Sequence, residues 1–269
     1  RQYSLCSSYR ALTKDSKRQF TTLIGRARGN VTTMSRAKVE LIPWDPESPD
    51  HVTRMIDQRI ACGWASDLVP QWQENQRTGF KCIYWLVLAD EDPEREARLA
   101  KHIAEYPKEK NSILDTAASI SATPRTPTGA SFHPVGHISL DIDNPAAAPL
   151  NLPIPKENVY WIKSLYVSFA LQSCGIARAA MDLVESMATS EPLCARTLML
   201  DTVSKEDQLR KESMVVAQGK LPPTPTHAWY ERRGYKLIHT INNFYGFPEK
   251  DPDGNLLIRR TVFLRRDLV

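Results

Sequence analysis

The residues with the clearest chemical potential lie in a loop between a predicted strand and a predicted helix. The apolar strand expected over residues 159–167 is followed by Gln172, Gly175 and Ala177, and a helix is expected over residues 175–188. The first amide groups of a helix have no partner within it and carry the positive end of its dipole, so they favour anions. Because Gly175 and Ala177 carry little or no side chain, a phosphate group could reach this backbone. The pattern predicts a phosphate-binding loop; the alternative is a helix start that only packs tightly against its strand.

The spacing of these residues resembles that of a known family. Gln172-x-x-Gly175-x-Ala177 is similar to the Q/R-x-x-G-x-G/A motif of the GNAT superfamily, whose members are acyl-CoA-dependent N-acetyltransferases. Leu165-x-Val167 matches the L-x-V that this family carries on the preceding strand. The loop and the strand before it therefore resemble the same family in composition and in order.

Two further segments resemble this family, in the order in which its members have them. Residues 228–235 (AWYERRGY) look like its A-x-x-Y-E-(K/R)-x-G-(F/Y) element, and residues 135–140 fit the strand before the cofactor strand. The resemblance spans residues 38–268. The sequence contains no G-x-G-x-x-G motif and no Walker lysine, so it does not indicate a dinucleotide-binding or P-loop protein.

The resemblance implies where acetyl-CoA, the cosubstrate of that family, would bind. Its pyrophosphate would lie on the loop amides of residues 173–178, and its pantetheine arm would run along the strand edge at residues 165–167 like an added strand. A backbone N–H near Val167 would donate to the thioester carbonyl and stabilise the oxyanion that forms there. The cofactor-binding residues expected on this basis are Leu165, Tyr166, Val167, Gln172, Ser173, Cys174, Gly175, Ile176, Ala177 and Arg178.

Tyr230 occupies the position that supplies the general acid in that family. A phenol suits this role because it can protonate a departing thiolate, whose conjugate acid has a pKa of about 8.5 against about 10 for the phenol. The alternative is that Tyr230 only packs between a helix and the sheet.

The general base is less clearly marked, because the cofactor strand carries no carboxylate where some family members place a glutamate. Asp201, on a predicted strand over residues 197–203, and Glu157, at the start of the cofactor strand, are the nearest candidates. Asp201 is the catalytic candidate that we retain, although it could equally fix a strand end. A chain of water molecules could also accept the proton.

The hydrophobic pattern of the whole chain predicts the elements that position these residues. Apolar alternation indicates strands, and apolar residues at helical spacing indicate amphipathic helices. Strands are expected over residues 39–43, 80–88, 135–142, 159–167, 197–203, 235–245 and 257–267, and helices over 50–64, 67–76, 91–106, 175–188, 205–217 and 226–233. This order predicts an α/β (α+β) protein with a mixed sheet and helices on both faces, and the resemblance implies a GNAT-like, mostly antiparallel sheet of about seven strands in one domain.

The N-terminal residues differ in composition from the rest of the chain. The net charge is +4, but residues 1–38 hold nine Lys or Arg and one acidic residue, Asp15, so the remainder is mildly acidic. We expect residues 1–37 to be a disordered, basic extension rich in Ser, Thr and Arg. The same composition fits an organelle transit peptide, or a segment that precedes a true start at Met34.

The remaining residues, 38–269, are expected to form the GNAT-like domain, with insertions near residues 91–134 and 205–225. Within the first insertion, residues 107–134 are rich in Thr, Ser, Pro and Ala, which is typical of a mobile surface loop. Both insertions could wall off a pocket beside the expected site.

Composition argues against several classes of protein. No run approaches the roughly 18 apolar residues of a membrane span. The five cysteines include no C-x-x-C pair, which argues against a disulfide framework or structural zinc and favours a reducing compartment. His133 and His137 are separated by Pro134 and Gly136, which break helical spacing, so no metal site is expected. We expect no nucleic-acid partner, because no aromatic residues interleave the basic extension. The expected location is the cytoplasm, or an organelle if the extension is a transit peptide.

The function predicted from these features is acetyl transfer from acetyl-CoA to a primary amine by direct attack in a ternary complex. A small-molecule acceptor is favoured because of the two insertions; a peptide N-terminus or a lysine side chain is the alternative. A CoA-binding or interaction domain without turnover is the rival from another class, since the strand carboxylate is missing and Ser204 stands where the family often has an Asn. The oligomeric state is not predicted.

Overall fold

The computed structural model describes residues 39–210, 224–246, 249–250 (backbone only) and 254–268. The predicted extension over residues 1–37 and the larger part of the predicted insertion near 205–225 lie outside the described residues. Among the helices that are described, none has both the length and the apolar character needed to cross a membrane.

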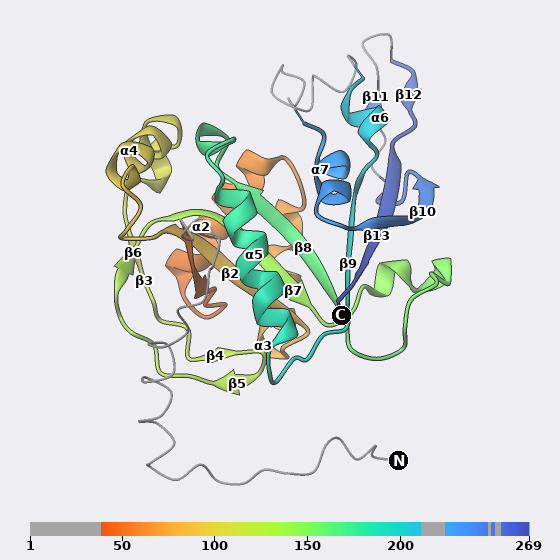
Figure 1. Ribbon diagram of the computed structural model, residues 1–269. Coiled ribbons are helices and arrows are strands. Elements are labelled where there is room, and N and C mark those ends of the chain that lie inside the picture. The colour runs from red at the N-terminus through yellow and green to blue at the C-terminus, as the bar shows by residue number, and fades with distance from the viewer. Residues whose placement is uncertain (1–38, 211–223, 247–248, 251–253, 269) are drawn as a thin grey trace, which may run out of the picture. The chain divides into compact units, whose positions relative to one another are not determined.

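The domain is built on a seven-stranded sheet with the order β1-β2-β7-β8-β9-β13-β10 (Figure 1). Every neighbouring pair in this sheet is antiparallel except β8 and β9, which are parallel. The expectation of a mixed, mostly antiparallel GNAT sheet is therefore confirmed. The strands are β1 (Val39–Pro43), β2 (Lys81–Leu88), β7 (Pro134–Asp141), β8 (Val159–Val167), β9 (Thr197–Val203), β10 (Lys236–Asn242) and β13 (Arg260–Asp267).

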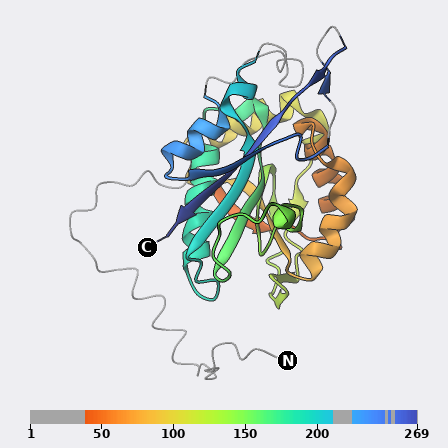
Figure 2. The ribbon, with the colours of Figure 1, turned by 90° about the vertical axis from the view of Figure 1, so that its right-hand side faces the viewer.

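Helices cover both faces of the sheet. Figure 2 shows α5 (Ile176–Thr189) and α7 (Thr226–Arg232) on one side and α2 (Pro49–Cys62) and α3 (Val69–Arg77) on the other. Because side chains alternate along a strand, neighbouring strand residues feed different cores. The core under α5 includes Leu86, Ile138, Ile162, Met181, Val184 and Leu198, and the core under α2 and α3 includes Met55, Val69, Trp72, Ile83 and Trp85.

The first insertion is more ordered than the sequence predicts. Helix α4 (Arg95–Glu105) forms as expected, but the following segment contains two short ribbons, β3 (Ile113–Leu114) with β6 (Ser131–Phe132) and β4 (Ser119–Ile120) with β5 (Thr123–Pro124). Asp115 organises it, because Arg125 donates to both carboxylate oxygens at 2.6 and 2.8 Å. The hydrogen bond from Arg125 also lowers the pKa of Asp115 well below its usual range. The sequence indicated only a loop here, because hydrogen bonds between residues ten or more apart leave no local pattern in the sequence.

Short elements connect the larger ones. They are η2 (Ser66–Leu68), η3 (Pro107–Glu109), η4 (Pro145–Leu150), η5 (Phe169–Leu171), α6 (Lys205–Gln208), β11 (Glu249–Lys250) and β12 (Leu256–Leu257). The helix predicted over residues 205–217 is described only as α6, since residues 211–223 lie outside the described part.

Gly136 on β7 sets the distance between two central strands. A Cβ atom at this position would lie 2.2 Å from the carbonyl oxygen of Tyr166 on β8, which is far inside van der Waals contact. We expect Gly136→Ala to lower the free energy of unfolding by about 3 kcal/mol, because backbone must move to admit the methyl group. Urea denaturation followed by circular dichroism measures the loss.

The matched control for this change is Gly129→Ala. Gly129 has a φ of +67° and nothing within 4 Å of its Cβ position, so it tests backbone strain without a clash. We expect this control to lose about 1 kcal/mol. Equal losses at the two positions would contradict the close approach of β7 and β8 at Gly136.

Candidate functional site

The parallel strands β8 and β9 separate after a short paired segment. They pair only from Val159 with Thr197 to Trp161 with Met199, and Figure 1 shows the strands diverging beyond that point. On its other side, β8 still pairs with β7 at Ile162, Lys163, Tyr166 and Val167. The side of β8 that faces β9 therefore becomes an internal strand edge, and such an edge can pair with an extended ligand. The residues predicted to bind pantetheine, Leu165 to Val167, lie on it.

A bulge lies in β8 where the strands separate. Tyr166 pairs with His137 and Lys163 with Ser139, so β8 advances by one more residue than β7 between these two pairs. Ser164, inside this interval, has a φ of +55°, in the left-handed region. A bulge bends its strand and increases the local twist, and this one bends β8 beside the opening.

The predicted phosphate-binding loop connects the wide end of this opening to α5. After Val167 the chain makes the short turn η5, and Ser173 and Gly175 adopt φ values of +65° and +83°. Gly175 is the N-cap of α5 without any side-chain capping bond, and the first backbone bond into the helix is Ala179 N–H to Gly175 O at 3.1 Å. The amides of residues 176–178 are thus free of helical partners. The structure brings Gln172 to Arg178 together at one helix N-terminus.

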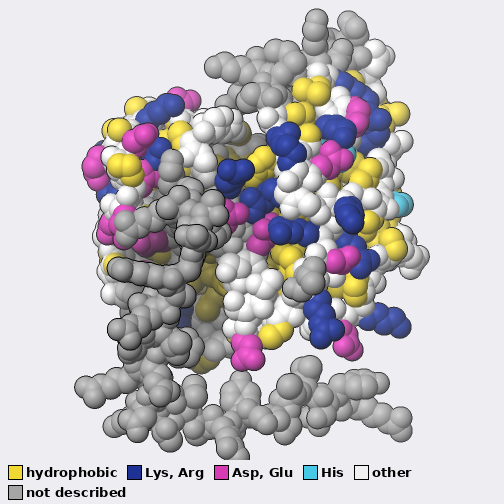
Figure 3. Space-filling model, viewed as in Figure 1, with side chains coloured by type: hydrophobic (Ala, Val, Ile, Leu, Met, Phe, Trp, Pro, Cys, Tyr) yellow, Lys and Arg dark blue, Asp and Glu magenta, His cyan; other side chains and the backbone are white. Residues whose placement is uncertain are grey.

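The space above Gly175 is open. A Cβ atom placed there would meet nothing within 4 Å. An anion can therefore approach the N-terminus of α5 without moving protein atoms, which is what a pyrophosphate would need. In Figure 3, Lys and Arg side chains outnumber acidic ones over the right-hand part of the face shown, where α7, β9 and β13 lie in Figure 1. Such a surface favours the approach of an anionic ligand.

Helix α4 of the insertion supports this loop from outside the sheet. The His102 ring nitrogen Nδ1 lies 2.9 Å from the Ser168 hydroxyl, and both side chains are buried. Burial lowers the pKa of Arg98, but the Asp92 and Glu94 carboxylates raise it overall. Helix α4 therefore packs against η5, where the chain enters the loop, a contact that the sequence did not predict.

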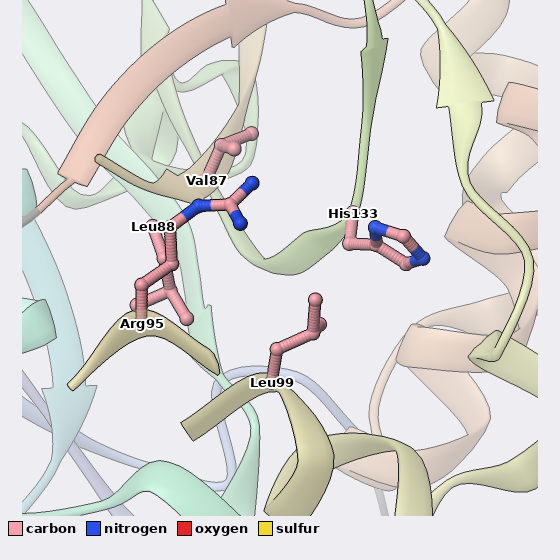
Figure 4. Close-up of a pocket in the computed structure, with 5 residues that line it drawn as sticks. All are labelled: Val87, Leu88, Arg95, Leu99 and His133. Carbon is pink, nitrogen blue, oxygen red and sulfur yellow. The ribbon is translucent and has the colours of Figure 1, made fainter. Parts of the chain in front are cut away.

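A small pocket lies between α4 and the end of β2. Val87, Leu88, Arg95, Leu99 and His133 line it (Figure 4). None of the residues predicted for the site takes part, so the candidate site is the opening between strands and not this pocket.

Tyr230 lies on α7, in the core shared with α5. Its ring contacts Trp229 and Tyr235, and its side chain is buried. Burial, followed by the negative charge of Asp201, raises the pKa of Tyr230 above its usual value. The phenol is therefore neutral throughout the physiological range and has a proton to donate.

Asp201 lies on β9 in the part that has left β8. Its Oδ1 accepts from the Lys163 ammonium of β8 at 3.0 Å, and its Oδ2 accepts from the Tyr245 hydroxyl. The carboxylate has a side-chain exposure of 8%. Sequence reasoning missed Lys163 and Tyr245: Lys163 could have been noticed as a charge inside an apolar strand, whereas no local signal marks Tyr245.

The other base candidate and the two histidines lie elsewhere. Glu157 precedes β8 and is exposed at the end where β8 and β9 still pair. His137 is buried against Gln58 and Arg59, and His133 is bound to the Lys110 carbonyl. Among the residues that the structure describes, no group of His, Cys, Asp and Glu could hold a metal ion.

Residues 90–235 match the sequence model of the acetyltransferase (GNAT) family. No curated protein sequence matches the chain. Similar solved structures include Arabidopsis thaliana NAA60 with a bisubstrate analogue (12% identity, TM-score 0.46, covering 86% of this chain and 99% of that chain). An aminoglycoside 6'-N-acetyltransferase with coenzyme A is also similar (13% identity, TM-score 0.45, covering 86% of this chain and 97% of that chain). So is an Elizabethkingia anophelis GNAT acetyltransferase with acetyl-CoA bound (12% identity, TM-score 0.43, covering 87% of this chain and 100% of that chain).

Proposed function

Because the chain belongs to the acetyltransferase (GNAT) family, we propose that it transfers the acetyl group of acetyl-CoA to a primary amine by direct attack. The observation that carries the proposal is the opening between β8 and β9, which ends at the free amides of α5. An open strand edge beside a helix N-terminus suits a molecule with an extended amide-containing arm and a pyrophosphate.

The proposed binding mode uses backbone groups of the described site. The pyrophosphate accepts hydrogen bonds from the amides of residues 173–178, and the pantetheine arm pairs with the edge of β8 at residues 165–167. Gln172 begins this loop, and the loop conformation depends on the positive φ angles of Ser173 and Gly175. An N–H near Val167 donates to the thioester carbonyl and stabilises the oxyanion as it forms.

The proposed chemistry has two proton transfers. The amine nitrogen attacks the thioester carbon, the carbon–sulfur bond breaks, and the thiolate takes a proton from the Tyr230 hydroxyl. The nitrogen gives up its extra proton to the Asp201 carboxylate, directly or through water. Tyr230 is neutral and so holds a proton to donate, and α7, which carries it, packs against β9, the strand that carries Asp201.

Asp201→Asn tests the base. The amide oxygen can still accept from Lys163 or Tyr245, but it cannot take a proton. We expect kcat to fall about a hundredfold while the Kd for acetyl-CoA stays unchanged. Single-turnover kinetics and calorimetry measure the two quantities. A kcat within twofold of wild type would assign the proton to water and leave Asp201 a structural partner of Lys163.

We propose a small amine as the acceptor. The Arg259 guanidinium, just before β13, lies 5.1 Å from the centre of the Trp64 ring, just after α2. We take this contact between the two ends of the sheet to limit access to the opening between β8 and β9, which suits a small molecule better than a folded protein.

A coupled thiol-release assay tests the function and the acceptor together. Wild-type protein is given acetyl-CoA and, in parallel, small amines, peptides with free N-termini and lysine peptides. Turnover with small amines supports the proposal. Turnover with peptides alone would mean that the acceptor is a peptide and not a small amine. Tight acetyl-CoA binding without turnover on any amine would favour the rival, a CoA-binding domain without activity.

A further inference from the structure

A buried ammonium group lies beneath the cofactor strand and has no part in the chemistry described above. Lys81 on β2 is 4% exposed. Its Nζ lies 3.0 Å from the Asp141 carboxylate and 4.8 Å from the centre of the Trp72 ring. Burial lowers the pKa of Lys81, and Asp141 opposes that shift. A buried ion pair contributes little net stability. The role of Lys81 therefore follows from its other hydrogen bonds.

Those other contacts lead to the bulge of β8, one directly and one through Ser139 on β7. Lys81 Nζ donates to the Ser164 hydroxyl at 3.2 Å and to the Ser139 hydroxyl at 2.8 Å. The Ser139 hydroxyl in turn donates to the Lys163 carbonyl at 3.2 Å. The ammonium group therefore holds the residue with the unusual backbone angle directly, and it holds the carbonyl just before that residue through Ser139.

The bulge needs such support. Ser164 has a φ of +55°, a conformation that costs a residue with a side chain about 1–2 kcal/mol. Without these hydrogen bonds, β8 can lower its energy by relaxing at Ser164 toward an ordinary extended conformation. The strand edge next to the bulge, Leu165 to Val167, is the edge proposed to bind the pantetheine arm, so its position depends on the angle at Ser164.

We propose that Lys81 is a positioning residue: its hydrogen bonds to Ser164 and Ser139 hold the bulge in β8, and the bulge presents the strand edge to the acyl-CoA cosubstrate. This inference rests on the proposed function. Lys81 touches neither substrate nor reacting atoms, and it acts from the opposite side of the sheet to α5. If the bulge were free to relax, only the fraction of molecules with the bulge formed would bind, and the apparent affinity would fall to that fraction of its full value.

Ser164→Ala and Ser164→Gly form a matched pair that tests this. Both remove the hydroxyl, but glycine adopts a positive φ without strain and alanine does not. We expect calorimetry of the full chain with acetyl-CoA to show about tenfold weaker binding for Ser164→Ala and near wild-type binding for Ser164→Gly. Equal weakening in both variants would overturn the inference, because it would mean that the hydroxyl itself matters and the backbone angle does not.

The role of Lys81 is tested in a variant that leaves no unpaired buried charge, Lys81→Met with Asp141→Leu. We expect about tenfold weaker binding of acetyl-CoA, and recovery when Ser164→Gly is added. Failure of the glycine to restore binding would overturn the role of Lys81. If the double variant does not fold, the Ser164 pair alone decides. Wild-type protein that does not bind acetyl-CoA would instead remove the proposed function on which the inference rests.

Discussion

Tyr230→Phe is expected to lower kcat by about two to three orders of magnitude and to leave the Kd for acetyl-CoA unchanged. The change removes only the hydroxyl that is proposed to protonate the departing thiolate, and a positioned general acid contributes rate factors of this size. The ring still fills its place against Trp229 and Tyr235. Pre-steady-state kinetics with a saturating amine measures kcat for the chemical step.

The loss should be the same across the pH range in which the protein is folded. Burial and Asp201 raise the pKa of Tyr230, so the phenol stays protonated well beyond neutral pH. A group with a raised pKa loses its proton only above the ordinary phenol value of about 10. The ratio of wild-type to variant rates is therefore expected to be constant between about pH 6 and pH 9.

Tyr235→Phe is the matched control. Tyr235 is buried in the same core, but its hydroxyl donates to Glu185 at 3.0 Å and has no proposed role in the reaction. We expect this variant to lose about 1 kcal/mol of stability, the usual worth of one hydrogen bond, and to keep its kcat. Equal kcat values for the Tyr230 and Tyr235 variants would contradict the role of Tyr230 as general acid.

Gly175→Glu is expected to weaken acetyl-CoA binding by at least about a hundredfold. The carboxylate would stand in the open space in front of α5, where the pyrophosphate is proposed to bind, and like charges at a few ångströms repel strongly near a protein surface. Calorimetry at low salt gives the largest difference, since added salt screens the repulsion.

Gly175→Gln separates charge from shape in this experiment. Glutamine has the size of glutamate and suffers the same strain at a φ of +83°, but it is neutral. We expect it to weaken binding by about tenfold, from backbone strain alone. If both variants bind equally well, the phosphate site is not at the N-terminus of α5.

The elements of the cofactor half were predictable because their signals are local. Residues 159–167 were expected as a strand and form β8 with the same bounds, and the helix expected over 175–188 appears as Ile176–Thr189. An apolar run and a helical apolar period do not depend on distant partners. Gln172 and Gly175 lie on the loop as expected, whereas Ala177, also expected there, lies in the first turn of α5.

The parts of the site that were missed are all long-range contacts. The hydrogen bonds of Lys81 to Ser139 and Ser164 join three strands. They form only because β2, β7 and β8 are neighbours in the sheet. Tyr245 reaches Asp201 from a connection far along the chain. The position of a side chain in the sequence does not reveal such partners, because strand order and register determine them.

Hydrogen–deuterium exchange of the full chain, with and without acetyl-CoA, tests the central claim most directly. The site as described predicts slower exchange at residues 173–178, of which 176–178 have amides without helical partners in the free protein, and at residues 165–167 on the open edge of β8. Binding of acetyl-CoA that slows exchange at both segments is the predicted result. Binding that protects neither segment, or no binding by folded protein, would contradict the placement of the cosubstrate between β8 and β9.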